Sequence, residues 1–297
     1  MVNPSYDPFG RGPMEVNVGT LEAHDTVRGR HHPCEIWSPA QPGRYPLVAF
    51  SHSSGGDRRQ SSFLCMHLAS HGYIVAALDH SERLAPELKR PEGESEVQRS
   101  ARIRSWIDNR VPDMQLLLDR MLDASWWNGA AMPDPDRVGV TGHSFGGWTA
   151  LALPEADARV RAIVALAPAG ASNPPPGIIP ATLTFRWGRD VPTLYLVAED
   201  DTALALDAMR ELFERTQSAR SMFVLRNADH GHFFDAFERR PGQCPADEAH
   251  RFTQALALAH FDQVLKEDRD ATAWLGDGVE GALSAHGVSA YIYREAP

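Results

Sequence analysis

The sequence has few cysteines and no long apolar run. Its three cysteines, Cys34, Cys65 and Cys244, lie far apart in no CxxC or Cys/His spacing, and an odd number cannot pair fully within one chain. A disulfide framework is therefore not expected. No segment approaches the roughly 18 apolar residues of a membrane span. The first residues, MVNPSYDPFGRGPMEV, lack the apolar stretch of a signal peptide. We expect a cytoplasmic protein without a membrane span.

Basic residues are outnumbered as well. Lys+Arg 29 against Asp+Glu 39 gives a formal net charge of −10, so the chain lacks the positive field that gathers polyanions. Nucleic acid is not expected as a partner, and neutral small molecules are favoured as substrates. The 297 residues otherwise have an ordinary globular composition, 43% hydrophobic and 23% charged, which allows a large core. Whether the chain forms a homodimer is left open.

Short apolar runs alternate with amphipathic stretches along the chain, which is typical of an α/β sheet. Eight strands are expected, at 15–18, 33–38, 47–51, 73–78, 138–141, 162–166, 193–197 and 221–225. The runs YIVAAL and AIVALA are apolar at nearly every position, as in parallel strands that are covered on both faces. We therefore expect a mostly parallel eight-stranded sheet with helices on both faces.

Two covering helices are predicted, at 104–122 and 247–266, because apolar residues recur there every three or four positions. Pro112 indicates a kink or a helix start. The charged segment 81–97 and the proline-rich segment 170–180 are interpreted as excursions over one domain, so residues 1–297 are expected to form a single domain. The segment from 81 to 104 follows the fourth strand, where it is a candidate for a mobile lid.

The sequence Gly142-His143-Ser144-Phe145-Gly146 lies between the predicted strand 138–141 and a helical run, GWTALAL. In this context the GxSxG pattern is typical of a nucleophilic serine, because the tight turn strains the serine backbone, exposes the hydroxyl and needs small neighbours. The helix that follows directs the N–H of Phe145 at negative charge beside Ser144. The alternative interpretation is that Ser144 only caps this helix.

A serine hydroxyl needs a base to take its proton, and the base needs an acid to orient it. The candidate acids follow the strand PTLYLVAEDD and the candidate bases follow the strand SMFVLRNADHGHFFD: Glu199, Asp200, Asp201, His230 and His232. Both sets lie just past carboxyl ends of strands, at the edge of the sheet where Ser144 is expected. The order serine, acid, histidine is that of the α/β hydrolases.

A second N–H donor is needed beside that of Phe145 to stabilise the oxyanion. The turn after the predicted strand 47–51 reads His52-Ser53-Ser54-Gly55-Gly56, which is flexible and rich in small residues. The backbone N–H of Ser54 is the preferred second donor. Loss of one such donor typically costs about 2.7 to 4 kcal/mol of transition-state stabilisation.

With these four elements in place, the chain resembles the α/β-hydrolase superfamily, and within it the dienelactone-hydrolase-like and platelet-activating-factor-acetylhydrolase-like esterases. The resemblance is carried by PLVAFSHSSGG, LASHGYIVAALDH, DRVGVTGHSFGGWTA, PTLYLVAEDD and ADHGHFFD. It implies the α/β-hydrolase fold and ester hydrolysis through an acyl-enzyme, with neither a metal nor an organic cofactor. A more remote similarity, through PTLYLVAEDD, is to the bacterial cutinase-like polyester hydrolases.

The resemblance places the nucleophile on Ser144, the acid on Asp201 and the base on His230. Family strands of this form carry the acid at the second residue after the glutamate, which favours Asp201 over Asp200 and Glu199. The family's base begins a pattern His-x-x-Phe-x-Asp. The residues from His230 to Asp235 fit this pattern, which favours His230 over His232.

Two departures from the family pattern affect the expected chemistry. Ser53 replaces the first glycine of the family's His-Gly-x-Gly turn, which weakens the assignment of the second oxyanion donor to Ser54. The elbow carries serine where dienelactone hydrolases themselves use a cysteine, which favours plain carboxylesterase chemistry over that lactone reaction.

These residues predict a serine carboxylesterase that acts on small-molecule esters. The loop between Leu166 and the predicted strand 193–197 is too short for the large helical cap of some lipases, so an open pocket for short acyl groups is favoured. A thioesterase, an amidase, a lyase or a polyester hydrolase on the same triad is the alternative. A non-catalytic binding protein of this fold is a third hypothesis, against which the complete set Ser144, Asp201 and His230 argues. Substrate-binding residues are not identified.

Overall fold

The computed structural model describes residues 6–295 and places their strands in one sheet of nine, ordered β1-β2-β4-β3-β5-β6-β7-β8-β9. The strands are β1 (Val16–Asp25), β2 (Arg30–Pro39), β3 (Gly43–Ser51), β4 (Ile74–Leu78), β5 (Ala131–His143), β6 (Val160–Leu166), β7 (Thr193–Ala198), β8 (Arg220–Leu225) and β9 (Ala290–Glu295). All pairs between β4 and β8 in this order are parallel, whereas β1, β2 and β9 pair antiparallel. The predicted α/β-hydrolase fold with a mostly parallel sheet is confirmed.

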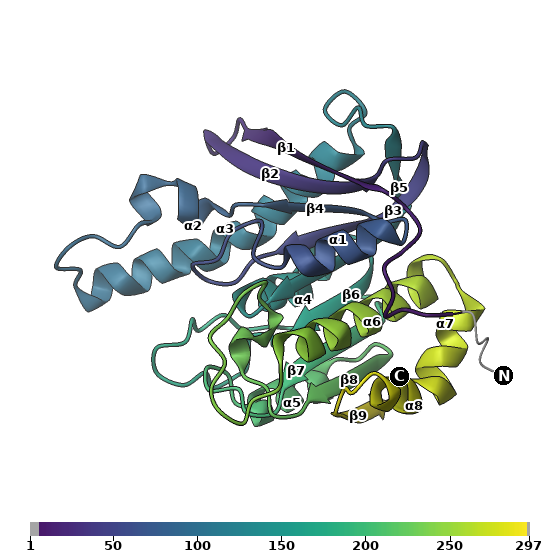
Figure 1. Ribbon diagram of the computed structural model, residues 1–297. Coiled ribbons are helices and arrows are strands. Elements are labelled where there is room, and N and C mark those ends of the chain that lie inside the picture. The colour runs from purple at the N-terminus through teal and green to yellow at the C-terminus, as the bar shows by residue number, and fades with distance from the viewer. Residues whose placement is uncertain (1–5, 296–297) are drawn as a thin grey trace.

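Helices cover both faces of the sheet, as predicted (Figure 1). On one face α1 (Ser62–Ser70) packs beside α6 (Ala246–Leu265), and on the other α3 (Glu96–Leu122) packs beside α4 (Phe145–Ala156). The strands between these layers are apolar because neither face meets water, and β4 and β7 are buried at every residue. The remaining elements are α2 (Ser81–Leu84), η1 (Pro86–Leu88), α5 (Leu206–Arg215), η2 (His230–Phe233), α7 (Arg269–Ala273), η3 (Trp274–Gly278) and α8 (Val279–Ala285).

The sheet has one strand more than the eight predicted. The extra strand, β9, follows α8 and pairs antiparallel with the edge of β8, with Tyr291 opposite Val224. Its sequence, AYIYRE, alternates apolar and polar residues only briefly, so the short run carried little signal by itself. β9 is stabilised by its pairing with β8, which its own sequence does not reveal.

The helix predicted at 104–122 begins eight residues earlier, at Glu96. Ser95 caps it: the Ser95 hydroxyl accepts the N–H of Gln98, and the Gln98 side chain accepts the N–H of Ser95 in return. Pro112 lies inside α3 and does not start it. The segment from 81 to 104 is therefore α2, η1, a short connection and the first turns of α3 rather than one long loop.

The long connections form no cap domain over the sheet edge where the parallel strands end, which is called the active edge below. In the part of the chain that the structure describes, residues 167–192 between β6 and β7 form neither a helix nor a strand, so no helical cap arises there. Within residues 6–295, no helix is both long enough and apolar enough to cross a membrane. The carboxyl ends of β3, β5, β7 and β8 are thereby left to carry the candidate catalytic residues.

Candidate active site

Ser144 is the single residue between β5 and α4, and its backbone is strained. Its φ of 57° and ψ of −115° lie in a region that residues with a Cβ rarely adopt. The surrounding turn holds it there: the Ser144 N–H donates to the Leu166 carbonyl at 2.9 Å, and the Ser144 carbonyl accepts the N–H of Ala169 at 3.0 Å. The Ser144 hydroxyl accepts no hydrogen bond from α4. The interpretation of Ser144 as a mere helix cap is therefore wrong.

Small residues around Ser144 are required by the close approach of β3. A Cβ on Gly146 would lie 1.9 Å from the carbonyl oxygen of Ser51, and a Cβ on Gly142 would lie 2.3 Å from the carbonyl oxygen of Gly146. Both contacts are with backbone, which cannot move aside. The glycines of the GxSxG pattern thus let the elbow pack against the turn that carries Ser54.

Asp201 and His230 meet across the active edge. His230 lies in η2, just past β8, and its Nδ1 is 2.7 Å from Oδ2 of Asp201. The other carboxylate oxygen, Oδ1, accepts the backbone N–H of Ala203 at 2.8 Å and that of Leu204 at 2.7 Å. The Asp201 side chain is fully buried, whereas that of His230 is 17% exposed. An acceptor on Nδ1 leaves Nε2 as the basic nitrogen of a neutral imidazole.

The competing acids and base point elsewhere. Both ring nitrogens of His232 are used by the backbone: Nδ1 accepts the N–H of Asp229 at 2.9 Å, and Nε2 donates to the Cys244 carbonyl at 3.3 Å. Burial lowers the pKa of His232, so the neutral form that makes these two bonds is favoured. The Asp200 side chain is exposed, and the Glu199 carboxylate accepts the N–H of Asn227. The geometry pairs His230 with Asp201 and with neither neighbour.

His143, directly before Ser144, connects the elbow to His230. Its ring lies 4.6 Å from that of His230, centroid to centroid, at 44°. Burial lowers the pKa of His143 well below its usual value, and the neighbouring His230 adds to this. The neutral ring accepts a hydrogen bond at Nδ1 from Nε2 of Gln60, 3.0 Å away. Oε1 of the same Gln60 accepts the backbone N–H of Ser53 at 2.9 Å. Gln60 therefore joins the elbow to the turn 52–56, the candidate oxyanion turn.

Gln60 was not identified from the sequence, although it lies only a few residues past the oxyanion turn. A polar residue in a turn carries no distinguishing pattern, because the side chain of Gln60 bonds to the backbone N–H and the hydroxyl of Ser53 and to a histidine brought near by folding. A cavity of about 370 Å³ lies over the same turn, lined by Ser53, Ser54, Gly55, Gly56, Asp57, Gln60, Phe234, Asp235 and Ala236. Ser144, Asp201 and His230 do not line this cavity, so it assigns no substrate contact.

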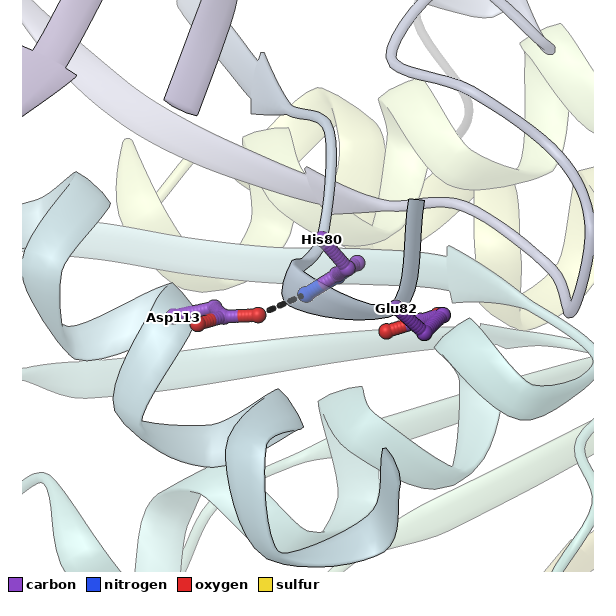
Figure 2. Close-up of side chains that lie close together, drawn as sticks. All are labelled: His80, Glu82 and Asp113. Atoms are coloured by element: carbon purple, nitrogen blue, oxygen red, sulfur yellow. Dashed lines mark hydrogen bonds and ion pairs between the residues drawn. The ribbon is translucent and has the colours of Figure 1, made fainter. Parts of the chain in front are cut away.

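Three buried ionisable side chains lie close together (Figure 2), and the backbone N–H of one of them, His80, donates to Nε2 of His52 in the turn 52–56. Ligand atoms of His80, Glu82 and Asp113 come within 4.8 Å of one another, the one such group among the described residues. Positive charge is already supplied by arginines, however: Arg110 pairs with Glu82, and Arg28 pairs with Asp113 at 2.7 Å. Both His80 nitrogens are also bonded within the protein. The donor set fits an internal ionic network better than a metal site.

Comparison with known proteins gives a consistent picture. The model of the Chlorophyllase family matches residues 5–189, a stretch that includes the elbow but ends before Asp201 and His230. The chain is similar to platelet-activating factor acetylhydrolase of Cavia porcellus, with 30% identity over 241 residues, covering 68% of this chain and 51% of that protein. Chlorophyllase type 0 of Chenopodium album is 24% identical over 186 residues, covering 61% of this chain and 50% of that protein.

A third relative is Cutinase est1 of Thermobifida alba, which is 26% identical over 200 residues, covering 66% of this chain and 56% of that protein. The chain thus spans about half the length of several curated relatives that it matches. None of these three similarities covers the full length of the relative.

Proposed function

The chain belongs to the chlorophyllase family of α/β hydrolases, and from this premise we propose that it is a serine carboxylesterase with Ser144 as nucleophile, His230 as base and Asp201 as acid. The observation that carries the proposal is the 2.7 Å bond between Nδ1 of His230 and the buried Asp201 carboxylate. This bond lies on the same sheet edge as the strained Ser144. A buried carboxylate that fixes the tautomer of a part-exposed histidine is what a serine nucleophile needs.

In the first half of the reaction, Nε2 of His230 takes the hydroxyl proton while Oγ of Ser144 attacks the ester carbonyl carbon. The N–H groups of Phe145 and Ser54 bind the oxyanion that forms. Asp201 stabilises the imidazolium without taking its proton. The tetrahedral intermediate then collapses, and His230 gives its proton to the departing alcohol.

In the second half, water enters where the alcohol left. His230 takes a proton from this water as its oxygen attacks the acyl carbon, the same N–H groups bind the new oxyanion, and Ser144 departs with the proton. The products are a carboxylic acid and the free enzyme. Each role falls on a residue of this chain, so the proposed cycle is complete without a metal or organic cofactor.

The substrate proposed is a neutral small ester with a short acyl group. The connection between β6 and β7 forms no helical cap in the described chain, and the chain carries a net charge of −10. Both features favour compact, uncharged esters over long-chain or polyanionic ones.

A substrate panel tests the proposal. Purified protein is expected to hydrolyse p-nitrophenyl acetate and butyrate with higher kcat/KM than p-nitrophenyl octanoate, and a fluorophosphonate probe is expected to label Ser144 alone. Matched thioesters, anilides and a polyester film separate the other reactions that the same triad supports. Absence of turnover on every ester, together with absence of labelling in folded protein, would reject the proposal in favour of a non-catalytic binding protein.

The acid is tested by replacing Asp201 and Asp200 separately by asparagine. Asp201→Asn is expected to lower kcat for p-nitrophenyl acetate by about 10⁴-fold, because the amide no longer favours the Nδ1–H tautomer of His230. Asp200→Asn is the matched control, since its exposed side chain is not bonded to His230, and it should keep kcat within about twofold. A larger loss at Asp200 than at Asp201 would reassign the acid.

A further inference from the structure

Arg110 is the largest side chain that is fully buried in the described part of the protein. It lies in the middle of α3, between Ile107 and Met114 on the helix face that packs on the sheet. Removing a guanidinium from water is expensive unless every charge and N–H finds a partner. Its Nε has no hydrogen-bond partner among the described residues, so the partners of the two Nη atoms must explain why the charge is buried here.

The guanidinium of Arg110 is directed at the oxyanion turn. Nη1 donates to the His52 carbonyl at 2.5 Å and Nη2 donates to the Ser53 carbonyl at 3.2 Å. The Glu82 carboxylate pairs with the same Nη2 and balances its charge. Arg110 therefore binds two successive carbonyls of the turn that carries the proposed second donor.

Binding the Ser53 carbonyl fixes the direction of the Ser54 N–H. The two groups belong to one peptide unit, which is planar, and no described peptide bond is cis, so they point in opposite directions. The Ser53 carbonyl accepts from Arg110, from Nδ1 of His52 at 2.7 Å and from the N–H of Gly56 at 3.1 Å. Because three donors hold the Ser53 carbonyl in place, the Ser54 N–H at the other side of this peptide unit is held in the opposite direction.

The preceding peptide unit is fixed at both ends in the same way. The His52 carbonyl accepts from Arg110, and the Ser53 N–H on the other side of that unit donates to Gln60 at 2.9 Å. A donor on a carbonyl also polarises its peptide unit and strengthens the N–H as a donor. Arg110 thus affects both the direction of the Ser54 N–H and its strength as a hydrogen-bond donor.

Arg110 also contacts the residue that supplies the first donor. Its guanidinium carbon lies 4.3 Å from the centroid of the Phe145 ring, a distance typical of a cation–π contact. The same ring stacks on Trp148, at 5.3 Å between centroids. Arg110 and Trp148 together hold the ring of Phe145, whose backbone N–H is at the first residue of α4.

We propose that Arg110 is a positioning residue that sets both N–H donors of the oxyanion hole, through the carbonyls of the Ser54 turn and the ring of Phe145. The inference rests on the proposed esterase function. Arg110 reaches no reacting atom; it acts through the two peptide units and the ring that it holds.

The group shown in Figure 2 is the support of this arginine. Glu82 pairs with Arg110, while His80 donates from Nδ1 to Asp113 at 3.1 Å and accepts at Nε2 from Ser51 Oγ at 2.8 Å. Ser51 Oγ in turn lies 3.3 Å from Nη1 of Arg110. These bonds repeat the serine, histidine and aspartate pattern of a catalytic triad, but all three side chains are buried, so the set steadies the base of the turn instead of meeting substrate.

Replacement of Arg110 by lysine is the main test. Lysine keeps the charge but has no planar fork for two carbonyls. We expect kcat for p-nitrophenyl acetate to fall by about 10- to 100-fold, because loss of a whole oxyanion donor costs about 10²- to 10³-fold, while KM stays within about threefold. A merely structural arginine would leave kcat per labelled active site unchanged, and that result would overturn the inference.

Arg189→Lys is the matched control. Arg189 also donates to four backbone carbonyls, those of Pro154, Asp157, Val160 and Trp187, but it touches neither the oxyanion turn nor the elbow. Its kcat per active site is expected to stay within about twofold of wild type. Arg189 is half-buried, whereas Arg110 is fully buried. An equal fall in kcat for the two lysine variants would show a general effect of replacing an arginine that binds backbone carbonyls and reject the specific role.

A double-mutant cycle tests whether Arg110 acts through the Ser54 N–H or through a general loss of structure. Ser54→Pro removes the second N–H altogether. Arg110→Lys added to Ser54→Pro should then lower kcat by no more than about threefold further, because coupled residues are not additive and only the contact of Arg110 with Phe145 is left to lose. Full multiplication of the two single effects would contradict the proposal.

Glu82→Gln covers the case in which Arg110 variants do not fold. It keeps the side-chain size and an acceptor for Arg110 but removes the balancing charge, and we expect kcat to fall roughly three- to tenfold. Wild-type kcat in this folded variant would count against the proposal. Failure of the esterase function itself is distinguishable, because wild-type protein would then neither turn over esters nor react with the fluorophosphonate probe.

Discussion

Ser144→Ala is expected to lower kcat for p-nitrophenyl acetate by about 10⁶-fold, which is the loss measured when a serine nucleophile of this kind is removed. Alanine keeps the elbow backbone but has no oxygen to form the acyl-enzyme. The remaining turnover, about 10³- to 10⁴-fold above that in water, would come from binding and from the oxyanion donors. The measurement is a progress curve at high enzyme concentration, with fluorophosphonate labelling lost in parallel.

The fold of this variant is expected to be unchanged, because the φ of 57° is imposed by the turn and not by the hydroxyl. Ser125→Ala is a suitable control, since Ser125 is an exposed serine that bonds only to Asp123. Ser144→Gly adds an internal check: glycine adopts these angles without a Cβ clash, so it should unfold at a higher temperature than Ser144→Ala while being equally inactive. Wild-type turnover in either Ser144 variant would end the proposed mechanism.

The candidate site has clearer sequence signals than some of the elements around it. The GxSxG elbow and the acid and histidine after β7 and β8 are short local patterns, and the parallel sheet brings them together by its geometry alone. The start of α3 was missed although Ser95 and Gln98 have capping-box spacing. The charged residues before this cap favour a loop, whereas the cap itself favours a helix start.

The role inferred for Arg110 could not be derived from the sequence, but a signal was present. Arg110 falls three residues after Ile107 and four before Met114, on the apolar face of the helix. A charged residue at a core position of an amphipathic pattern is uncommon enough to be questioned. Its partners, the carbonyls of His52 and Ser53, are backbone atoms with no sequence signature, so only the folded chain identifies what the charge is for.

The choice between the two histidines rests on the same kind of information. Both follow β8 within three positions, and the sequence separates them only through the family pattern. In the fold their partners differ in kind: His230 meets a carboxylate, whereas His232 meets the backbone N–H of Asp229 and the carbonyl of Cys244. These partners suit His230 for the proposed proton transfer and suit His232 for holding a loop.

His230→Gln and His232→Gln, measured side by side, therefore have opposite expected results. His230→Gln should lower kcat by about 10⁶-fold, since loss of the base costs about as much as loss of the nucleophile, with little change in the unfolding temperature. His232→Gln should keep kcat within a few-fold but lower stability by about 1 to 3 kcal/mol, because a buried backbone donor or acceptor loses its partner. Turnover and urea unfolding of both variants decide the matter. A larger fall in kcat at His232 would move the base to that residue and leave the Asp201 bond to His230 without a catalytic purpose.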